Sequence, residues 1–155
     1  EVLIGPSHAS DAGDTILIVG VGKLMTSLGR CCKPAPPDPI IGFVSRGRGV
    51  TIHRRGCINI PMLSPERLIE AEWGNATLAT FPVDIVIDAG DRTGLLRDIT
   101  EIFSREHVNV IGANTVTRDA SAHMRLTVEI ASIAELNRVL ALVRDVAGVT
   151  RAVRR

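Results

Sequence analysis

The stretch FPVDIVIDAGDRTGLLRDITEIFSREH, residues 81–107, joins a strand pattern directly to a helix pattern. In its first ten residues apolar side chains alternate with others, which predicts a strand over 81–90 with one buried face. The apolar residues that follow recur at helical spacing, and Asp91 or Thr93 offers an oxygen that could cap the start of that helix. The strand face holds Val83, Ile85 and Ile87, and the helix face holds Leu95, Ile99, Ile102 and Phe103.

The residues downstream continue this alternation of strands and helices. NVIGANTVTRD (109–119) is predicted as a strand that contains a glycine, and AHMRLTVEIA (122–131) as a second strand with alternating apolar residues. SIAELNRVLALVRDVAG (132–148) is an amphipathic helix that Gly148 ends, and VTRAVRR forms a last strand. The order βαββαβ is that of the ferredoxin-like plan, so the predicted fold class is α+β. The alternating strand residues are Met124, Leu126, Val128 and Ile130, and the helix face holds Ile133, Leu136, Leu140 and Val143.

Two classes of domain share this order, so the site must distinguish them. RNA-recognition domains stack bases on aromatic residues of their central strands, and residues 109–119 and 122–131 contain no aromatic residue. The turn DAGDRTGLLRDI, with Asp91 and Gly94 at the entry to the helix, instead resembles the motif of ACT domains over residues 82–155. ACT domains commonly pair edge to edge, and the resemblance implies an amino-acid site between the loop of one copy and a strand of the other. The implied ligand-binding residues are Asp91, Arg92, Thr93, Gly94, Leu95, Asn109, Val110, Ile111 and Gly112.

The chemistry of that loop fits an amino acid. Backbone N–H groups at a helix N-terminus can hold a carboxylate, and apolar side chains can take an aliphatic group. The alternative is that Leu95 and Ile111 are core residues and that no ligand binds. Because unpaired sheet edges promote association, we expect a homodimer that forms through this domain.

The first half of the chain is predicted as a small β-rich domain. TILIVG (15–20) is apolar and β-branched, which favours a strand. IIGFVS (40–45) and GVTIHR (49–54) form a predicted hairpin, whose RGRG turn has glycines where positive φ is needed. Ahead of the hairpin, four prolines exclude regular helix and predict a stiff turn. They are Pro34, Pro36, Pro37 and Pro39.

Two segments of this domain favour short helices. Leu24 and Leu28 are spaced for a helical turn, and SPERLIEAEW (64–73) begins with a serine before Pro-Glu, as helices often do. The small, polar stretch GNATLAT that follows is predicted as a linker. The expected organisation is a linker or cut edge over 1–13, a cysteine-containing domain over 14–73, a linker over 74–80 and an ACT domain over 81–155.

All three cysteines lie in RCCKPAPPDPIIGFVSRGRGVTIHRRGC, residues 30–57. An odd number of cysteines favours a reducing cytosol over secretion. Three thiols and one imidazole make a complete ligand set for zinc, provided that the chain bends after Arg30 so that adjacent cysteines can share one ion. The candidate zinc ligands are Cys31, Cys32, His53 and Cys57.

Other roles for these side chains stay open. The thiols could be buried or free while His53 only packs. The nearby arginines favour thiolates, so the cysteines could also react with oxidants. Nucleophilic catalysis is disfavoured because no further acid is placed to orient His53.

The same segment is strongly basic, although the net charge of the chain is only +1. From Lys23 to Cys57, seven basic residues accompany one acidic residue, Asp38, a local excess of six positive charges. Such an excess fits a phosphate-rich partner such as RNA, and the alternative is a solvated basic face without a partner. The candidate RNA contacts are Arg30, Lys33, Arg46, Arg48, Arg54 and Arg55.

The run from Cys31 to Cys57 resembles the cysteine-containing, zinc-finger-like domain of long RelA/SpoT-type proteins, which make and degrade (p)ppGpp. In that family an ACT domain follows directly, so the resemblance covers residues 14–155, and it is closer to the RelA branch. Pro37 replaces a family glycine, so the turn before Asp38 must differ, and Gly56 replaces an acid tied to regulation and ribosome contact. The matching positions are Cys31, Cys32, Pro34, Pro36, Asp38, Ile40, Gly42, Gly47, Gly49, His53 and Cys57.

The resemblance implies a non-catalytic regulatory region of a GTP pyrophosphokinase that acts in the stringent response. It implies docking to ribosomal RNA when uncharged tRNA occupies the A site, and hence control of (p)ppGpp synthesis on amino-acid starvation. An ACT-domain sensor of a branched-chain amino acid, acting through the dimer interface, is the alternative. A P-loop and clustered metal-binding carboxylates are absent from the sequence, as expected for a non-catalytic region. We expect a cytoplasmic protein, because no apolar run approaches the roughly 18 residues of a membrane helix and the N-terminus lacks a signal-peptide pattern.

Overall fold

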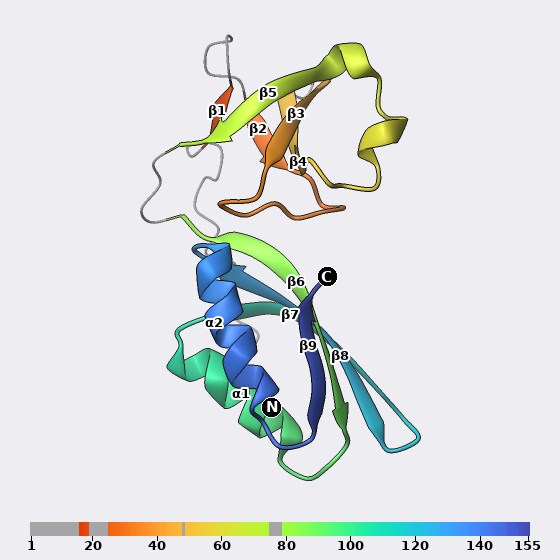
Figure 1. The fold of residues 1–155 in the computed structure, drawn as a ribbon, viewed down its shortest axis with the longest axis vertical. Helices are drawn as coiled ribbons and strands as arrows, with labels where there is room; N and C mark the ends of the chain where they lie inside the picture. The colour runs from red at the N-terminus through yellow and green to blue at the C-terminus, as the bar shows by residue number, and fades with distance from the viewer. Residues whose placement is uncertain (1–15, 19–24, 48, 75–78) are drawn as a thin grey trace. The chain divides into compact units, whose positions relative to one another are not determined.

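The computed structural model describes residues 16–18, 25–47, 49–74 and 79–155, with side chains described from residue 25 onward. The chain divides into two compact units, and the division lies between Phe81 and Pro82 (Figure 1). The predicted linkers over 1–13 and 74–80 lie wholly or largely outside the described residues. In the described part of the chain, no helix is long and apolar enough to cross a membrane.

The N-terminal unit is a five-stranded sheet with the order β1-β5-β3-β4-β2. The hairpin of β3 and β4 lies at its centre, with the predicted bounds, and Ser45 pairs with Gly49 across the turn. Gly47 and Gly49 have φ of +73° and +75°, which confirms the glycine requirement of the RGRG turn. The strands are β1 Ile16–Ile18, β2 Thr26–Leu28, β3 Ile40–Ser45, β4 Gly49–Arg54 and β5 Leu68–Trp73.

The core of this unit contains mainly β-branched residues from the central strands. Ile40, Val50, Ile52 and Ala71 are buried, and residues from three strands, β2, β3 and β5, pack against them. These partly buried residues are Leu28, Val44, Ile69 and Trp73. A sheet of short strands is therefore held by contacts between residues far apart in the sequence.

The prediction of a helical turn around Leu28 was wrong. Thr26–Leu28 is strand β2, which pairs parallel with β4, and Leu24 lies outside the described residues. The strand can lie there because Val50 donates its N–H to the Met25 carbonyl at 2.8 Å. Gly49 leaves room for that carbonyl, since a Cβ at this position would stand 2.2 Å from the oxygen.

The helix predicted at residues 64–73 was also wrong beyond its first turn. Pro65–Arg67 forms a single turn of 3-10 helix, η3, and a similar turn, η2, spans Ile60–Met62. The chain then extends as β5 and pairs antiparallel with β3. Burial of Ala71, with partial burial of Ile69, on the sheet stabilises the extended form over a helix with the same sequence.

The C-terminal unit has the predicted βαββαβ order and forms a four-stranded sheet with the order β7-β8-β6-β9. Both helices cover one face of that sheet (Figure 1). The buried face of β6 holds Val83, Ile85 and Ile87, as predicted. The elements are β6 Phe81–Gly90, α1 Leu95–Arg105, β7 Asn109–Arg118, β8 Ser121–Ile130, α2 Ile133–Arg144 and β9 Val149–Arg154.

The helix faces are those predicted, but the helix ends differ. All four predicted residues of α1 are buried, whereas on α2 Val139 is buried and Ile133 only partly so. The N-cap of α1 is Gly94, with φ of +82° and no side-chain cap, instead of Asp91 or Thr93. Helix α2 ends at Arg144, four residues before Gly148, whose φ of +95° serves the turn into β9.

Candidate functional site

Three cysteines and one histidine meet at one end of the N-terminal sheet. The ligand atoms of Cys31, Cys32, His53 and Cys57 all lie within 4.8 Å of one another. The two adjacent cysteines follow β2, His53 lies on β4, and Cys57 lies in the turn after β4. Because β2 and β4 run parallel, both strands deliver these side chains to the same end of the sheet.

The distances in this cluster match those of a tetrahedral zinc site. Cys31 Sγ lies 3.4 Å from His53 Nδ1 and 3.6 Å from Cys57 Sγ, and Cys32 Sγ lies 3.7 Å from His53 Nδ1. With ordinary zinc bond lengths, tetrahedral ligands are about 3.8 Å apart for two sulfurs and about 3.6 Å apart for sulfur and nitrogen. Three of the six separations are thus close to those of a zinc site, and all four ligand atoms lie within 4.8 Å of one another.

A turn makes it possible for adjacent cysteines to face one centre. Residues 30–32 form a turn that Lys33 closes by donating its N–H to the Gly29 carbonyl at 2.9 Å. Lys33 itself has φ of +43°, and the chain bends at the place where zinc binding requires a bend. Both Cys31 and Cys32 consequently approach His53.

The environment shifts the pKa values of the two adjacent thiols in opposite directions. Burial raises the pKa of the Cys32 thiol to about 12, although the Arg54 N–H opposes this shift. Partial burial also raises the pKa of Cys31, but hydrogen bonds from Asn59, Cys57 and Cys32 outweigh it and leave that pKa below its ordinary value. Burial lowers the pKa of His53, so its imidazole is neutral and able to bind a metal near neutral pH.

Groups outside the ligand set fix the cluster, and sequence reasoning did not identify them. The Arg54 N–H donates to Cys32 Sγ at 3.3 Å. Gly29 lies against the imidazole, because a Cβ there would stand 2.9 Å from His53 Nδ1. Such second-layer contacts orient metal ligands, and only the folded geometry reveals them.

The proline turn ahead of the hairpin is closed by Asp38. Its carboxylate accepts the Ala35 N–H at 2.9 Å, and its own N–H donates to the Ala35 carbonyl at 2.8 Å. The Trp73 indole N–H donates to the Asp38 carbonyl at 2.9 Å. Asp38 thus holds this turn, in which Pro37 stands where the family resemblance leads us to expect a glycine.

The predicted RNA-binding residues fall at both ends of the β3–β4 hairpin. Arg46 is exposed at the turn, and Arg30 is exposed beside the cysteines. Arg54 lies 3.8 Å from Asp38, and Arg55 pairs with Glu70. Lys33 is half-buried at the bend, and Arg48 lies outside the described residues.

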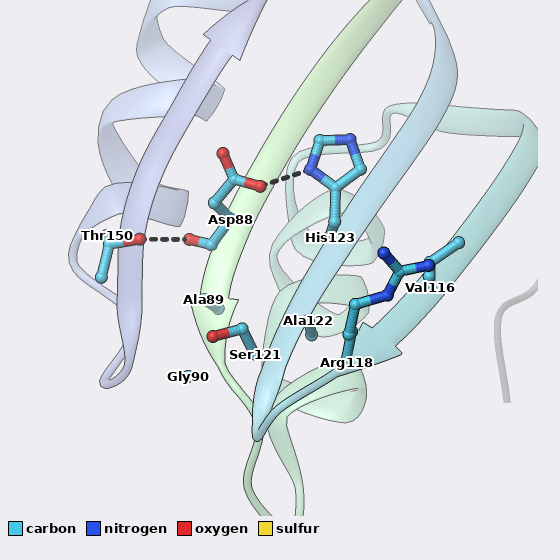
Figure 2. A pocket seen from close by; sticks show the side chains of 9 residues that line it. All are labelled: Asp88, Ala89, Gly90, Val116, Arg118, Ser121, Ala122, His123 and Thr150. Atoms are coloured by element: carbon cyan, nitrogen blue, oxygen red, sulfur yellow. Dashed lines mark hydrogen bonds and ion pairs between the residues drawn. The ribbon is translucent and has the colours of Figure 1, made fainter.

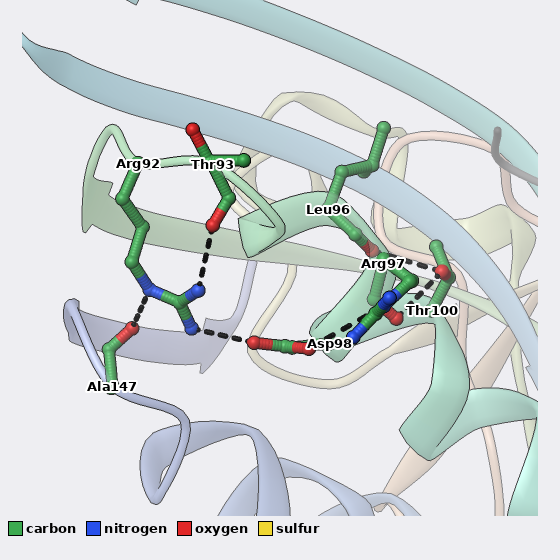
Figure 3. A network of polar contacts seen from close by, with 7 residues as sticks. All are labelled: Arg92, Thr93, Leu96, Arg97, Asp98, Thr100 and Ala147. Atoms are coloured by element: carbon green, nitrogen blue, oxygen red, sulfur yellow. Dashed lines mark hydrogen bonds and ion pairs between the residues drawn. The ribbon is translucent and has the colours of Figure 1, made fainter.

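The predicted ligand loop of the C-terminal unit is tied down by Arg92 (Figure 3). Its guanidinium donates to the carbonyls of Ala147 at 2.9 Å and Thr93 at 3.1 Å, and to the Asp98 carboxylate at 2.7 Å. The neighbouring Asp91 donates its N–H to the Ala120 carbonyl at 2.8 Å. The loop is therefore connected by hydrogen bonds to the turn before β9, through Ala147, and to the turn between β7 and β8, through Ala120.

The other predicted ligand residues differ in how deeply they are buried and in what they contact. Leu95 and Val110 are core residues, 4% and 5% exposed. Asn109 donates to the buried Glu129 at 2.8 Å. Ile111 is partly buried, and the pairing with β8 shifts between Val110 and Gly112. Within one copy of the chain, the strand residues thus serve mainly the fold.

An open groove of about 670 Å³ lies elsewhere in this unit, and the sequence reasoning did not predict it. Asp88 pairs there with His123 across β6 and β8, and its backbone carbonyl accepts the Thr150 hydroxyl (Figure 2). Arg151 lies 3.8 Å from the same carboxylate. In the sequence, the polar residues that alternate with the buried residues of β6 and β8 could have indicated this exposed face of the sheet. The lining residues are Asp88, Ala89, Gly90, Val116, Arg118, Ser121, Ala122, His123 and Thr150.

Comparison with known families assigns both units. Residues 77–154 match the ACT domain family, and residues 16–74 match the RelA/SpoT RIS domain family. The two matches leave out only the ends of the chain and a short stretch between them.

Curated relatives match almost the whole chain. It is 43% identical over 148 residues to the GTP pyrophosphokinase of Streptomyces coelicolor. The matched region covers 94% of this chain and 18% of that protein. It is 38% identical over 152 residues to the GTP pyrophosphokinase of Escherichia coli K12, with 95% and 20% covered. The chain thus spans about a fifth of the length of the curated relatives it matches.

A solved structure also resembles half of the chain. The crystal structure of the ACT domain from the GTP pyrophosphokinase of Chlorobium tepidum is 22% identical, with a TM-score of 0.46. The similarity covers 50% of this chain and 100% of that one.

Proposed function

This chain belongs to the RelA/SpoT family as the C-terminal region that carries the RIS and ACT domains, and we propose that it regulates a GTP pyrophosphokinase. The parent enzyme would transfer pyrophosphate from ATP to GTP or GDP in other domains. The cluster found among the described residues supports a non-catalytic role, because it consists of three thiols and an imidazole. Pyrophosphoryl transfer instead needs carboxylates that hold Mg²⁺.

The RIS unit is proposed to hold one zinc ion on Cys31, Cys32, His53 and Cys57. The observation that supports this is the closeness of their ligand atoms, which all lie within 4.8 Å of one another, three of the separations being 3.4–3.7 Å. The ion would act structurally, because four protein ligands leave no open position for a substrate. It would fasten the turn at residues 30–32 to β4 and to the turn that follows.

Elemental analysis of the purified, unreduced chain tests this assignment. About one zinc per chain is expected, and Cys57→Ser or His53→Gln should lower that content strongly. A chain that stays free of zinc after incubation with the ion and dialysis would contradict the proposal. The Trp73 fluorescence of each variant reports whether the RIS unit still folds, since Trp73 is the only tryptophan.

Ribosomal RNA is proposed as the partner of the exposed basic residues of the RIS unit. The excess of six positive charges between Lys23 and Cys57 supports it, together with the exposure of Arg30 and Arg46. Binding that depends on phosphate contacts weakens steeply with salt, by orders of magnitude between about 50 and 200 mM. Through this contact the region would report amino-acid starvation to the synthetase.

Co-sedimentation with ribosomes at two salt concentrations tests the RNA contact. Reversal of charge in the double variant R30E/R46E should lower the bound fraction and flatten the salt dependence. R97E/R105E is the control with the same change of charge, because Arg97 and Arg105 are exposed arginines on α1, in the ACT unit. Unchanged sedimentation of R30E/R46E would overturn the assignment.

Self-association is proposed for the ACT unit. Strand β7 lies at one edge of the sheet, and its residues 113–118 are exposed. An exposed edge offers backbone groups to a second copy. Light scattering over a range of concentrations tests this, and a monomer throughout would contradict it.

A further inference from the structure

We propose that Cys31 and Cys57 are a peroxide-sensitive thiol pair, which hydrogen peroxide converts to a disulfide. The inference rests on the proposed metal site, because the same two sulfurs would serve as zinc ligands. Oxidation would remove two of the four ligands and release the ion. The RIS unit would then sense oxidants as well as dock to its partner.

The two sulfurs lie close enough to react after a small movement. Cys31 Sγ and Cys57 Sγ are 3.6 Å apart, and a disulfide bond is about 2.05 Å long. The residues lie in two turns, one after β2 and one after β4, where small backbone shifts do not disturb strand pairing. The contact therefore permits bond formation within the folded unit.

Exposure determines which sulfur reacts with the oxidant first. Cys31 is exposed on its turn, whereas Cys57 is only 7% exposed. Peroxide in solution can reach the first thiol directly, and the second thiol lies beside it, shielded from solvent. Cys31 is thus placed as the attacking cysteine, and Cys57 as the one that completes the disulfide.

Cys32 is less well placed for either step. Its sulfur accepts the Arg54 N–H at 3.3 Å and is partly buried. A disulfide with its neighbour Cys31 is disfavoured, because consecutive Cα atoms are about 3.8 Å apart and disulfides usually need about 4.4–6.8 Å. The 3.6 Å contact and the exposure of Cys31 therefore favour the Cys31–Cys57 pair over a pair that includes the less accessible Cys32.

The chemistry balances with hydrogen peroxide as the oxidant. The Cys31 sulfur, as thiolate, attacks one peroxide oxygen, the O–O bond breaks, and sulfenic acid forms while hydroxide leaves and becomes water. The Cys57 sulfur then attacks the Cys31 sulfur, an S–S bond forms, and the S–O bond breaks to release a second water. The two cysteines lose two electrons and two protons, and peroxide is reduced to two waters.

The disulfide would preserve the fold that the ion supports. It joins residues 26 positions apart and encloses the β3–β4 hairpin, as the metal does. A cross-link of this kind restricts the unfolded chain and so stabilises the folded unit. Release of zinc should consequently leave Trp73 fluorescence nearly unchanged, and a dithiol reductant should restore zinc binding.

Treatment of the 155-residue chain with a small molar excess of hydrogen peroxide tests the proposal. One sample is loaded with zinc and the other is stripped by a chelator. Both should lose two of the three thiols and two hydrogens in mass, and peptide mapping should find Cys31 joined to Cys57. The loaded sample should also release its zinc to a chromogenic indicator. A disulfide that includes Cys32, or links only between chains, would overturn the proposal.

Variants separate this proposal from the zinc assignment. In stripped protein, Cys32→Ser should still form the disulfide, whereas Cys31→Ser and Cys57→Ser should not. An intramolecular disulfide in Cys31→Ser, or none in a folded Cys32→Ser, would contradict the pairing. If no preparation binds zinc but the Cys31–Cys57 disulfide forms, the metal assignment fails while the thiol pair stands.

Discussion

Gly29 lies so close to His53 that any side chain at residue 29 would collide with the imidazole of the candidate metal site. A Cβ on Gly29 would stand 2.9 Å from His53 Nδ1 and 3.1 Å from the Ile52 carbonyl oxygen. Its own N–H donates to that carbonyl at 2.7 Å, so the glycine is fixed in place. The imidazole can face the cysteines only because this position carries no side chain.

Gly29→Ala should therefore weaken zinc binding at least tenfold and destabilise the RIS unit. Overpacking of this kind typically costs about 1–3 kcal/mol. Competition with a chromogenic chelator measures the affinity, and urea unfolding followed by Trp73 fluorescence measures the stability. Gly56→Ala is the matched control, because a Cβ there meets nothing within 4 Å. Equal effects of the two substitutions would show that Gly29 does not position His53.

Gly49→Ala should destabilise the RIS unit more than Gly47→Ala. Gly47 has φ of +73° and Gly49 has φ of +75°, and a positive φ costs an alanine about 1 kcal/mol or more. A Cβ at Gly47 meets open space, whereas one at Gly49 would stand 2.2 Å from the Met25 carbonyl oxygen. The difference between the two variants in the free energy of unfolding, obtained from urea unfolding, measures how much stability depends on the close approach of β2 to Gly49 of β4. Indistinguishable midpoints would mean that β2 does not need this approach.

Arg92→Met should destabilise the ACT unit by about 1–2 kcal/mol, since hydrogen bonds from a half-exposed charged group are lost. Arg97→Met is the control, because Arg97 is 83% exposed on its side chain and lies 4.0 Å from Asp98. Helical circular dichroism monitors this unit selectively, since α1 and α2 are the α-helices of the described chain. A variant R92M as stable as R97M would show that the loop holds without its arginine.

Zinc affinity should increase with pH across the neutral range. The raised pKa of Cys32, about 12, means that the metal-free thiol keeps its proton, and zinc must displace that proton to bind the sulfur. Each displaced proton makes the affinity fall about tenfold for every unit by which the pH is lowered. Competition titrations at two pH values measure the slope. An affinity independent of pH would exclude thiolate ligation by Cys32.

Local patterns were sufficient to predict much of this fold. The β3–β4 hairpin and the βαββαβ order follow from alternation, helical spacing and turn glycines, and the structure confirms them. Strands β2 and β5 were missed because each is extended only by pairing with distant strands. The cap of α1 was missed because Gly94 begins the helix through its own backbone conformation.

The ligand set of the candidate site was predictable from residue types, but its geometry was not. The turn that lets Cys31 and Cys32 face His53 depends on backbone bonds to Gly29. Asn59 and the Arg54 N–H have no signature in the sequence. The groove beside Asp88 was missed for a related reason, since its lining residues come from four different strands.

The parallel pairing of β2 with β4 means that the end of β2 that carries Cys31 and Cys32 must wait, during synthesis, for a strand made later. Cys31 and Cys32 leave the ribosome before His53 and Cys57, and at about 5–20 residues per second the 26 positions from Cys31 to Cys57 take roughly 1–5 s. During that interval the first two thiols have no partner from the rest of the cluster. All four candidate ligands are available only when the hairpin has closed and Cys57 has been added, so an ion held by all four would mark a nascent chain translated past Cys57, with β5 still to join the sheet.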